Sequence, residues 1–126
     1  MKAILLKFKF KGKPTVINAP INISKECIEM GFSTSFEKNI KSKDTLVFVN
    51  NKKEYVDFLK KNLDAVELDS VLWFAYPKGT SGVKTDVNRD ILRVTAEEYG
   101  VTAITAISIN AIWSALRFRP IDRVGK

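Results

Sequence analysis

The chain has 126 residues, of which 45% are hydrophobic and 28% are charged, and these values are ordinary for one soluble globular domain. No apolar run approaches the ~20 residues that a membrane-spanning helix needs, and the N-terminal MKAILLKFKF lacks the long apolar core of a signal peptide. The single cysteine, Cys27, cannot form an internal disulfide. We therefore expect a cytoplasmic protein without a membrane partner.

The net charge of +7 is carried by the two ends of the chain. Residues 1–13 contain five lysines and no acid, and residues 117–126 contain four basic residues and one acid. Basic ends of this kind suit a nucleic acid or a protein as partner. The N-terminal lysines alternate with Phe8 and Phe10, which is also typical of an edge strand with its phenylalanines turned inward. We predict a basic edge strand or arm over residues 1–12 and a basic tail over residues 120–126.

Up to residue 63, short β-like runs alternate with segments of helical periodicity. In chain order we predict a strand at 14–18, a helix at 23–30, a strand at 45–49 and a helix at 52–63. The run at 45–49 is almost wholly apolar, as expected for a strand that is covered on both faces. Gly31 is placed to end the first helix, because glycine readily adopts the left-handed conformation that follows a helix.

The second half continues this alternation and closes with two strands. We predict a strand at 71–76, a loop at 77–85, a helix at 87–99, and strands at 103–109 and 113–118. The inner side of the helix is expected to consist of Ile91, Leu92, Val94, Thr95 and Tyr99, with Gly100 at its end. Only three residues join the last two strands, so these strands must form an antiparallel hairpin.

This order of elements predicts an α/β fold for a single domain over residues 1–126. Strands that alternate with helices favour a three-layer sandwich with a mainly parallel sheet, here with an antiparallel C-terminal hairpin. In such a fold, ligands bind at the carboxyl ends of the parallel strands, where loops and helix N-termini converge. Seven polar or aromatic side chains are expected at this rim: Asn18, Asn50, Tyr76, Asn110, Trp113, Ser114 and Arg117.

Trp113 has two interpretations. In the first it is a core residue beneath a helix, because aromatic residues in sheets mostly pack in the interior. In the second its indole is a platform beside Arg117 that stacks a planar ligand. Alternation along the strand places Trp113 on the face opposite to Ser114 in either case.

The segment YPKGTSGVKTDVNRD, residues 76–90, is the candidate anion site. Two residues separate its glycines and Val83 precedes Lys84-Thr85, so its spacing differs from that of the best-known phosphate loop. It nevertheless leads through glycines, hydroxyls and lysines to a helix N-terminus, where unpaired amides attract anions. The candidate residues are Lys78, Gly79, Thr80, Ser81, Gly82, Lys84 and Arg89. The alternative is a solvated loop in which the glycines only make turns.

Catalytic chemistry has little support in the sequence. The chain has no histidine, which removes the commonest general base and most zinc sites. Cys27 lies on an apolar helix side and is interpreted as a buried thiol. Asp86 and Asp90 stand one turn apart where a helix begins, so we expect them to cap that helix and to stabilise its dipole. We predict neither catalytic nor metal-binding residues and name no cofactor.

Two motifs resemble the signatures of a family of small bacterial proteins of unknown function. They are YPKGTSG at 76–82, followed by Arg89-Asp90 on the next helix, and WSALRF at 113–118. The turn Asn18-Ala19-Pro20 extends the resemblance over residues 13–120. The resemblance implies a bacterial source and an α/β fold, and it brings no established activity with it.

Loop and rim together predict a non-catalytic binding module for a small anionic ligand, such as a nucleotide or another phosphate compound. One alternative is an interaction protein that binds a protein or a nucleic acid through its basic termini. The other is an enzyme whose reaction the sequence does not indicate.

Overall fold

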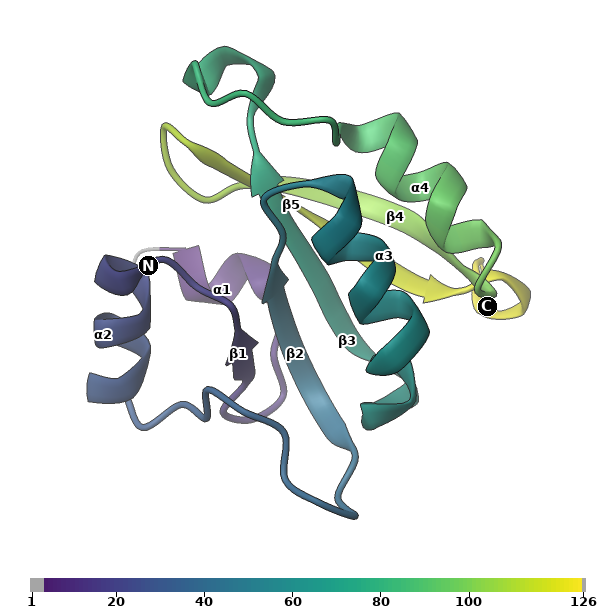
Figure 1. Ribbon diagram of the computed structural model, residues 1–126. Coiled ribbons are helices and arrows are strands. Elements are labelled where there is room, and N and C mark those ends of the chain that lie inside the picture. The colour runs from purple at the N-terminus through teal and green to yellow at the C-terminus, as the bar shows by residue number, and fades with distance from the viewer. Residues whose placement is uncertain (1–3, 126) are drawn as a thin grey trace.

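The computed structural model describes residues 4–125 and confirms the α/β class. Five strands form one mixed sheet in the order β1-β2-β3-β5-β4, and helices pack on both faces of the sheet (Figure 1). The strands are β1 (Thr15–Ile17), β2 (Ser42–Phe48), β3 (Val66–Pro77), β4 (Val101–Ser108) and β5 (Trp113–Pro120). The helices are α1 (Leu5–Phe8), α2 (Ile21–Glu29), α3 (Lys52–Lys61) and α4 (Arg89–Glu97), with 3₁₀ turns η2 (Leu63–Ala65), η3 (Gly79–Ser81) and η4 (Ile121–Arg123).

The sheet is mixed and not mainly parallel, because half of its strand pairings are antiparallel. β1 and β2 are parallel, as are β2 and β3, whereas β5 runs antiparallel to both β3 and β4. The predicted hairpin of β4 and β5 is therefore confirmed. The hairpin adds to the sheet through β5, so the last strand of the chain lies inside the sheet, between β3 and β4, and β4 forms the edge.

Helices α3 and α4 cover one face of the sheet. Phe74 on β3 is the centre of this core, since its ring meets Tyr55, Phe58 and Phe118 edge to face at centroid distances of 4.9, 5.4 and 5.3 Å. The Tyr55 hydroxyl donates a hydrogen bond of 2.7 Å to the backbone carbonyl of Leu92, which connects α3 to α4. Burial raises the pKa of Tyr55, so its phenol keeps the proton that it donates.

Helices α1 and α2 cover the opposite face. Trp73 on β3 donates a hydrogen bond of 2.8 Å from its indole nitrogen to the backbone carbonyl of Phe8, and the two rings meet edge to face. Ile23 and Cys27 from α2 belong to the same core. Cys27 is fully buried, which confirms the sequence interpretation, and burial raises the pKa of its thiol.

The N-terminal segment forms the short helix α1, so the predicted edge strand is wrong. Phe8 is buried and stacks on Phe10 at a centroid distance of 5.1 Å, and the rings do point inward as alternation suggests. One helical turn followed by Lys9 in the left-handed conformation, at φ 60°, produces this arrangement. A period of two over so short a run does not distinguish a strand from a single turn. Residues 1–3 of the predicted arm and residue 126 of the predicted tail lie outside the described residues.

The inner side of α4 also differs from the prediction. Leu92 and Ala96 are fully buried, whereas Val94 is 51% exposed. Each residue turns a helix by about 100°, so Val94 lies about 200° from Leu92 and faces solvent although it is apolar. Gly100 follows the helix at φ 86° and ends it as expected, because this left-handed conformation favours glycine.

Candidate functional site

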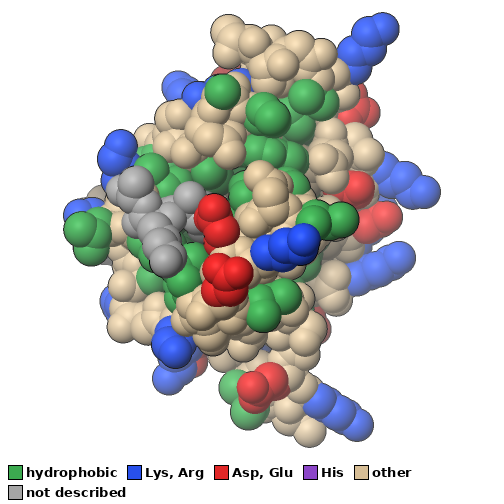
Figure 2. Space-filling model, turned by 90° about the vertical axis from the view of Figure 1, so that its left-hand side faces the viewer, with side chains coloured by type: hydrophobic (Ala, Val, Ile, Leu, Met, Phe, Trp, Pro, Cys, Tyr) green, Lys and Arg blue, Asp and Glu red, His purple; other side chains and the backbone are tan. Residues whose placement is uncertain are grey.

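The predicted rim forms a cavity of about 500 Å³, called the rim crevice below. It brings together four of the predicted side chains: Asn18 after β1, Asn50 after β2, and Asn110 and Trp113 from the β4–β5 hairpin. Most of the other residues that line it are apolar, among them Pro20, Ile23, Pro77, Val83 and Ile112. Figure 2 faces this side of the molecule and shows hydrophobic side chains gathered in its upper half.

A shared carboxylate holds Asn18 and Asn50 in place. The Asn18 Nδ2 donates to the carbonyl of Phe48 at 2.9 Å and to Glu54 Oε1 at 3.1 Å. Asn50 donates to the same oxygen from its backbone N–H at 2.9 Å and from its Nδ2 at 3.0 Å. Glu54, in the first turn of α3, thus ties the ends of β1 and β2 together.

The sequence interpretation missed Glu54, although a signal for it was present. Asn51 is the N-cap of α3 and accepts a hydrogen bond of 2.9 Å from the Glu54 backbone N–H. An asparagine followed three residues later by glutamate is close to the capping-box pattern, in which the glutamate side chain reaches back to a backbone N–H before the helix. Here the glutamate reaches Asn50, so the helix cap also shapes the rim crevice.

Asn110 forms the turn of the hairpin and positions Trp113. Its Oδ1 accepts hydrogen bonds of 2.9 Å from the backbone N–H groups of Ile112 and Trp113. The indole then meets the ring of Phe48 edge to face at a centroid distance of 5.0 Å. Trp113 is only 7% exposed, which confirms that it is a core residue, while the exposed part lines the rim crevice.

The other three rim candidates, Tyr76, Ser114 and Arg117, do not line the rim crevice. Tyr76 is buried in the core beneath α3 and α4, and Ser114 pairs with it across β3 and β5. Arg117 lies opposite Trp73, further along β5. Because β5 runs away from the rim, only its first residue reaches the crevice.

The loop at 78–84 is fastened to the hairpin by Lys78. The Lys78 ammonium donates a hydrogen bond to the hydroxyl of Ser108, and its backbone N–H donates to the carbonyl of Ile112 at 2.7 Å. Within the loop, the Ser81 hydroxyl donates to the Lys78 carbonyl at 2.7 Å and accepts from the Val83 N–H at 3.2 Å. Gly79, Thr80, Gly82 and Lys84 are exposed, with Gly82 at φ 80°.

The glycine turn and the N-terminus of α4 lie apart, joined by an extended segment (Figure 1). Thr85 and Asp86 in this segment attach to the start of α3 and the residue before its cap, because the Thr85 hydroxyl donates to the Asn50 carbonyl and Asp86 accepts from the Lys52 N–H, each at 2.7 Å. Arg89, on the first turn of α4, lies instead in a groove beside β4. The loop and Arg89 therefore do not form one cluster.

The N-cap of α4 is Asn88, which accepts a hydrogen bond of 2.8 Å from the Ile91 N–H. The prediction that Asp86 caps this helix is wrong, since Asp86 binds the first amide of α3. Asp90 does lie in the first turn of α4, where a carboxylate stabilises the helix dipole.

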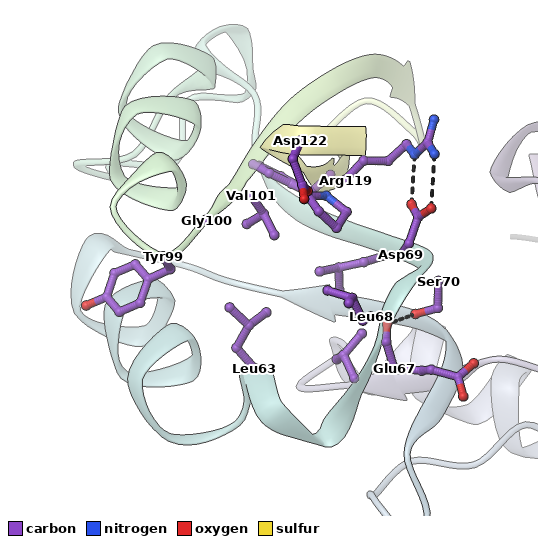
Figure 3. Close-up of a pocket in the computed structure, with 14 residues that line it drawn as sticks. Leu63, Glu67, Leu68, Asp69, Ser70, Tyr99, Gly100, Val101, Arg119 and Asp122 are labelled. Carbon is purple, nitrogen blue, oxygen red and sulfur yellow. Dashed lines mark hydrogen bonds and ion pairs between the residues drawn. The ribbon is translucent and has the colours of Figure 1, made fainter. Parts of the chain in front are cut away.

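A second cavity, of about 290 Å³, lies at the opposite edge of the sheet, where the sequence predicted no site (Figure 3). Its walls are largely apolar and include Leu63, Leu72, Tyr99, Val101 and Phe118. Ser42 pairs with Val66 and Asp44 pairs with Val71, so residues 67–70 of β3 bulge out of the sheet and form one wall. We call this hollow the bulge cavity.

An ion pair holds the bulge against β5. Asp69 adopts the left-handed conformation, at φ 55°, and its carboxylate accepts hydrogen bonds of 2.9 and 3.1 Å from the Arg119 guanidinium (Figure 3). This hydrogen bond and the positive charge of Arg119 lower the pKa of Asp69.

Replacing Asp69 with asparagine should make the protein less sensitive to acid. Because the folded-state pKa of Asp69 is lowered, the ion pair stabilises the fold above the unfolded pKa of about 3.9 and is lost as the pH falls through the folded pKa. Asparagine tolerates the left-handed backbone but carries no charge. Urea unfolding from about pH 5 to pH 2 should show a slightly larger loss of stability in wild type than in Asp69→Asn, since exposed pairs contribute little. Asp64→Asn in η2 is the control, and equal losses in all three proteins would contradict the prediction.

The fold and the cavities define an α/β protein with a five-stranded mixed sheet, an asparagine-lined crevice at one edge and an apolar cavity at the other. No protein-family model, curated protein or solved structure matches the chain. The resemblance to a family of small bacterial proteins therefore stays a prediction. Between residues 4 and 125, no helix is long and apolar enough to cross a membrane, and the acidic and thiol side chains form no group that could hold a metal ion.

Proposed function

We propose that the protein is a non-catalytic binding module whose small ligand occupies the rim crevice. The observation that carries this proposal is that side chains from three separate connections, Asn18, Asn50 and the pair Asn110 and Trp113, line one cavity of about 500 Å³. Small-molecule sites typically have volumes of about 300–1,000 Å³ and combine apolar walls with a few polar groups.

An anionic ligand, such as a phosphate compound, is the form of this proposal that the sequence favours. Lys84 is exposed and follows Val83, which lines the rim crevice. Lys78 follows Pro77, another lining residue, and could exchange its hydrogen bond to Ser108 for one to an anion. The phosphate would then lie at the mouth of the crevice, beside the two ammonium groups. The proposal includes three further properties. Helices on both faces of the sheet support a three-layer, Rossmann-like arrangement. The sequence motifs support a bacterial source, and the single buried cysteine supports a cytoplasmic location.

Tryptophan fluorescence tests this proposal. Trp113 lines the rim crevice, whereas Trp73, the other tryptophan of the chain, is 1% exposed. A panel of phosphate, nucleotides, sugar phosphates and neutral heterocycles should contain a compound that changes the emission saturably and raises the melting temperature. The emission change should persist in Trp73→Phe and disappear in Trp113→Phe. Weaker binding in Lys78→Ala or Lys84→Ala would support the anionic form, and a panel without any response would overturn the proposal.

The second candidate function is binding of a nucleic acid or an acidic protein through the basic termini. It is supported by the exposure of Lys7, Lys9, Lys11 and Lys13. Because Phe8 is part of the core, the test replaces Lys7, Lys9 and Lys11 with glutamine and leaves the helix in place. Salt-sensitive binding to DNA or RNA that these changes abolish would support this candidate, and unchanged binding would exclude it.

A further inference from the structure

Chemistry alone determines how three of the asparagine side chains in the rim crevice are oriented. A backbone carbonyl or a carboxylate can only accept a hydrogen bond, and a backbone N–H can only donate one. Asn18 contacts the Phe48 carbonyl and the Glu54 carboxylate, and Asn50 contacts the same carboxylate, so both must direct Nδ2 toward these acceptors. Asn110 contacts two backbone N–H groups and must direct Oδ1 toward them.

The polar groups left for a ligand therefore differ between the two walls of the crevice. Within residues 4–125, no hydrogen bond engages Oδ1 of Asn18, Oδ1 of Asn50 or Nδ2 of Asn110. The wall at the ends of β1 and β2 thus offers two carbonyl-type acceptors, and the hairpin wall offers an amide donor. Asn22 from α2 also lines the crevice and, being exposed, can turn either way.

The rest of the lining restricts the charge and the shape of the ligand. Among the described residues, none that lines the rim crevice is charged. A cation seated inside would lose hydration without gaining a counter-charge, which costs free energy, and an anion would gain only the partial positive charge at the N-terminus of α2. Pro20 and the small exposed parts of Pro77 and Trp113 instead offer rigid apolar surface, against which a flat ring packs well.

We infer that the rim crevice binds an uncharged planar heterocycle with a cyclic amide edge, of the kind found in nucleobases. Its ring N–H groups donate to Asn18 and Asn50, and a ring carbonyl accepts from Asn110. This inference rests on the proposed function and names the class of ligand. A phosphate carried by the same compound lies outside, at the lysines of the loop.

A pair of matched ligands tests the inference on the wild-type protein. Uracil has two ring N–H donors, and in 1,3-dimethyluracil both are replaced by methyl groups while the ring and its carbonyls remain. We expect uracil to quench or shift the Trp113 emission saturably and 1,3-dimethyluracil to bind at least about tenfold more weakly, as expected when acceptors that the bound ring covers lose their donors. Hypoxanthine, with a larger ring and the same cyclic amide edge, serves as a second probe. Equal binding of uracil and its dimethyl derivative would overturn the inference.

An isosteric variant tests the donor on the hairpin wall. In Asn110→Asp, one carboxylate oxygen still accepts from the backbone N–H groups of Ile112 and Trp113, so the turn is retained, but the donor is replaced by an acceptor. Binding of the heterocycle should weaken at least about tenfold. The control is Asn39→Asp, which makes the same change at an exposed position outside the crevice. Equal affinity in the two variants would overturn the inference.

The outcomes separate this inference from the proposed function. If phosphate or sugar phosphates bind and both heterocycles fail, the ligand class is wrong while the binding module stands. If no probe changes the Trp113 emission or the melting temperature, both are wrong. If Asn110→Asp is too unstable for binding measurements, the comparison of uracil with 1,3-dimethyluracil on the wild-type protein still tests the inference.

Discussion

Replacing Phe74 with alanine should lower the free energy of unfolding by about 3–5 kcal/mol. Phe74 is fully buried, and its ring touches Tyr55 and Phe58 of α3 and Phe118 of β5. Alanine would remove the ring from three edge-to-face contacts at once. α3 packs on Phe74 from above the sheet, whereas β5 lies beside it within the sheet. Neither element can move to fill the resulting cavity without losing its contacts with the other.

Chemical unfolding monitored by circular dichroism measures this effect. Leu68→Ala is the matched control, because Leu68 lies on the same strand but is 72% exposed. We expect the control to change stability by no more than about 0.5 kcal/mol. A loss in Phe74→Ala as small as that in the control would show that the face beneath α3 and α4 is not packed as described.

Replacing Trp73 with alanine should destabilise the protein by a similar amount, about 3–5 kcal/mol, and should also release α1. The indole fills the opposite face and donates its only hydrogen bond to the carbonyl of Phe8. α1 has only four residues, too few to be stable without tertiary contacts. Amide hydrogen exchange in residues 5–10 should therefore accelerate in the variant more than exchange in β2.

Trp73→Phe separates packing from hydrogen bonding. This variant keeps an aromatic ring but leaves the Phe8 carbonyl without its donor, so we expect a smaller loss of about 1–3 kcal/mol. Unchanged exchange at residues 5–10 in both variants would mean that α1 does not depend on Trp73.

The rim crevice was partly predictable because strand ends can be read locally. Asn18 and Asn50 each follow a run of β-forming residues, and Asn110 lies in a link too short for anything but a hairpin. The prediction extended too far along the last strand, to Ser114 and Arg117, because an antiparallel strand leaves the rim after its first residue. Glu54 was missed although its capping pattern is local, whereas the orientation of the Asn18 amide depends on a hydrogen bond between residues 36 positions apart.

The positions of the loop lysines and of Arg89 were likewise not predictable from local sequence. The composition of residues 76–90 suggested that lysines, glycines and Arg89 would act together on an anion. In the structure Lys78 binds the hairpin, the extended segment binds α3, and Arg89 lies beside β4. Each of these partners is distant in sequence, so no local pattern could reveal it.

By itself, the sequence determined the α/β class, the hairpin and the positions of most helices and strands. These features depend on neighbours two to four residues apart, and the periodicity of side chains records such neighbours directly. Only the tertiary structure decided that β5 lies between β3 and β4, that residues 5–8 form a helix docked on Trp73, and that residues 67–70 bulge to form a second cavity. Strand order and helix docking depend on which apolar faces, distant in sequence, pack against one another. The periodicity of side chains does not record this, because many arrangements of the same helices and strands have the same periodicity.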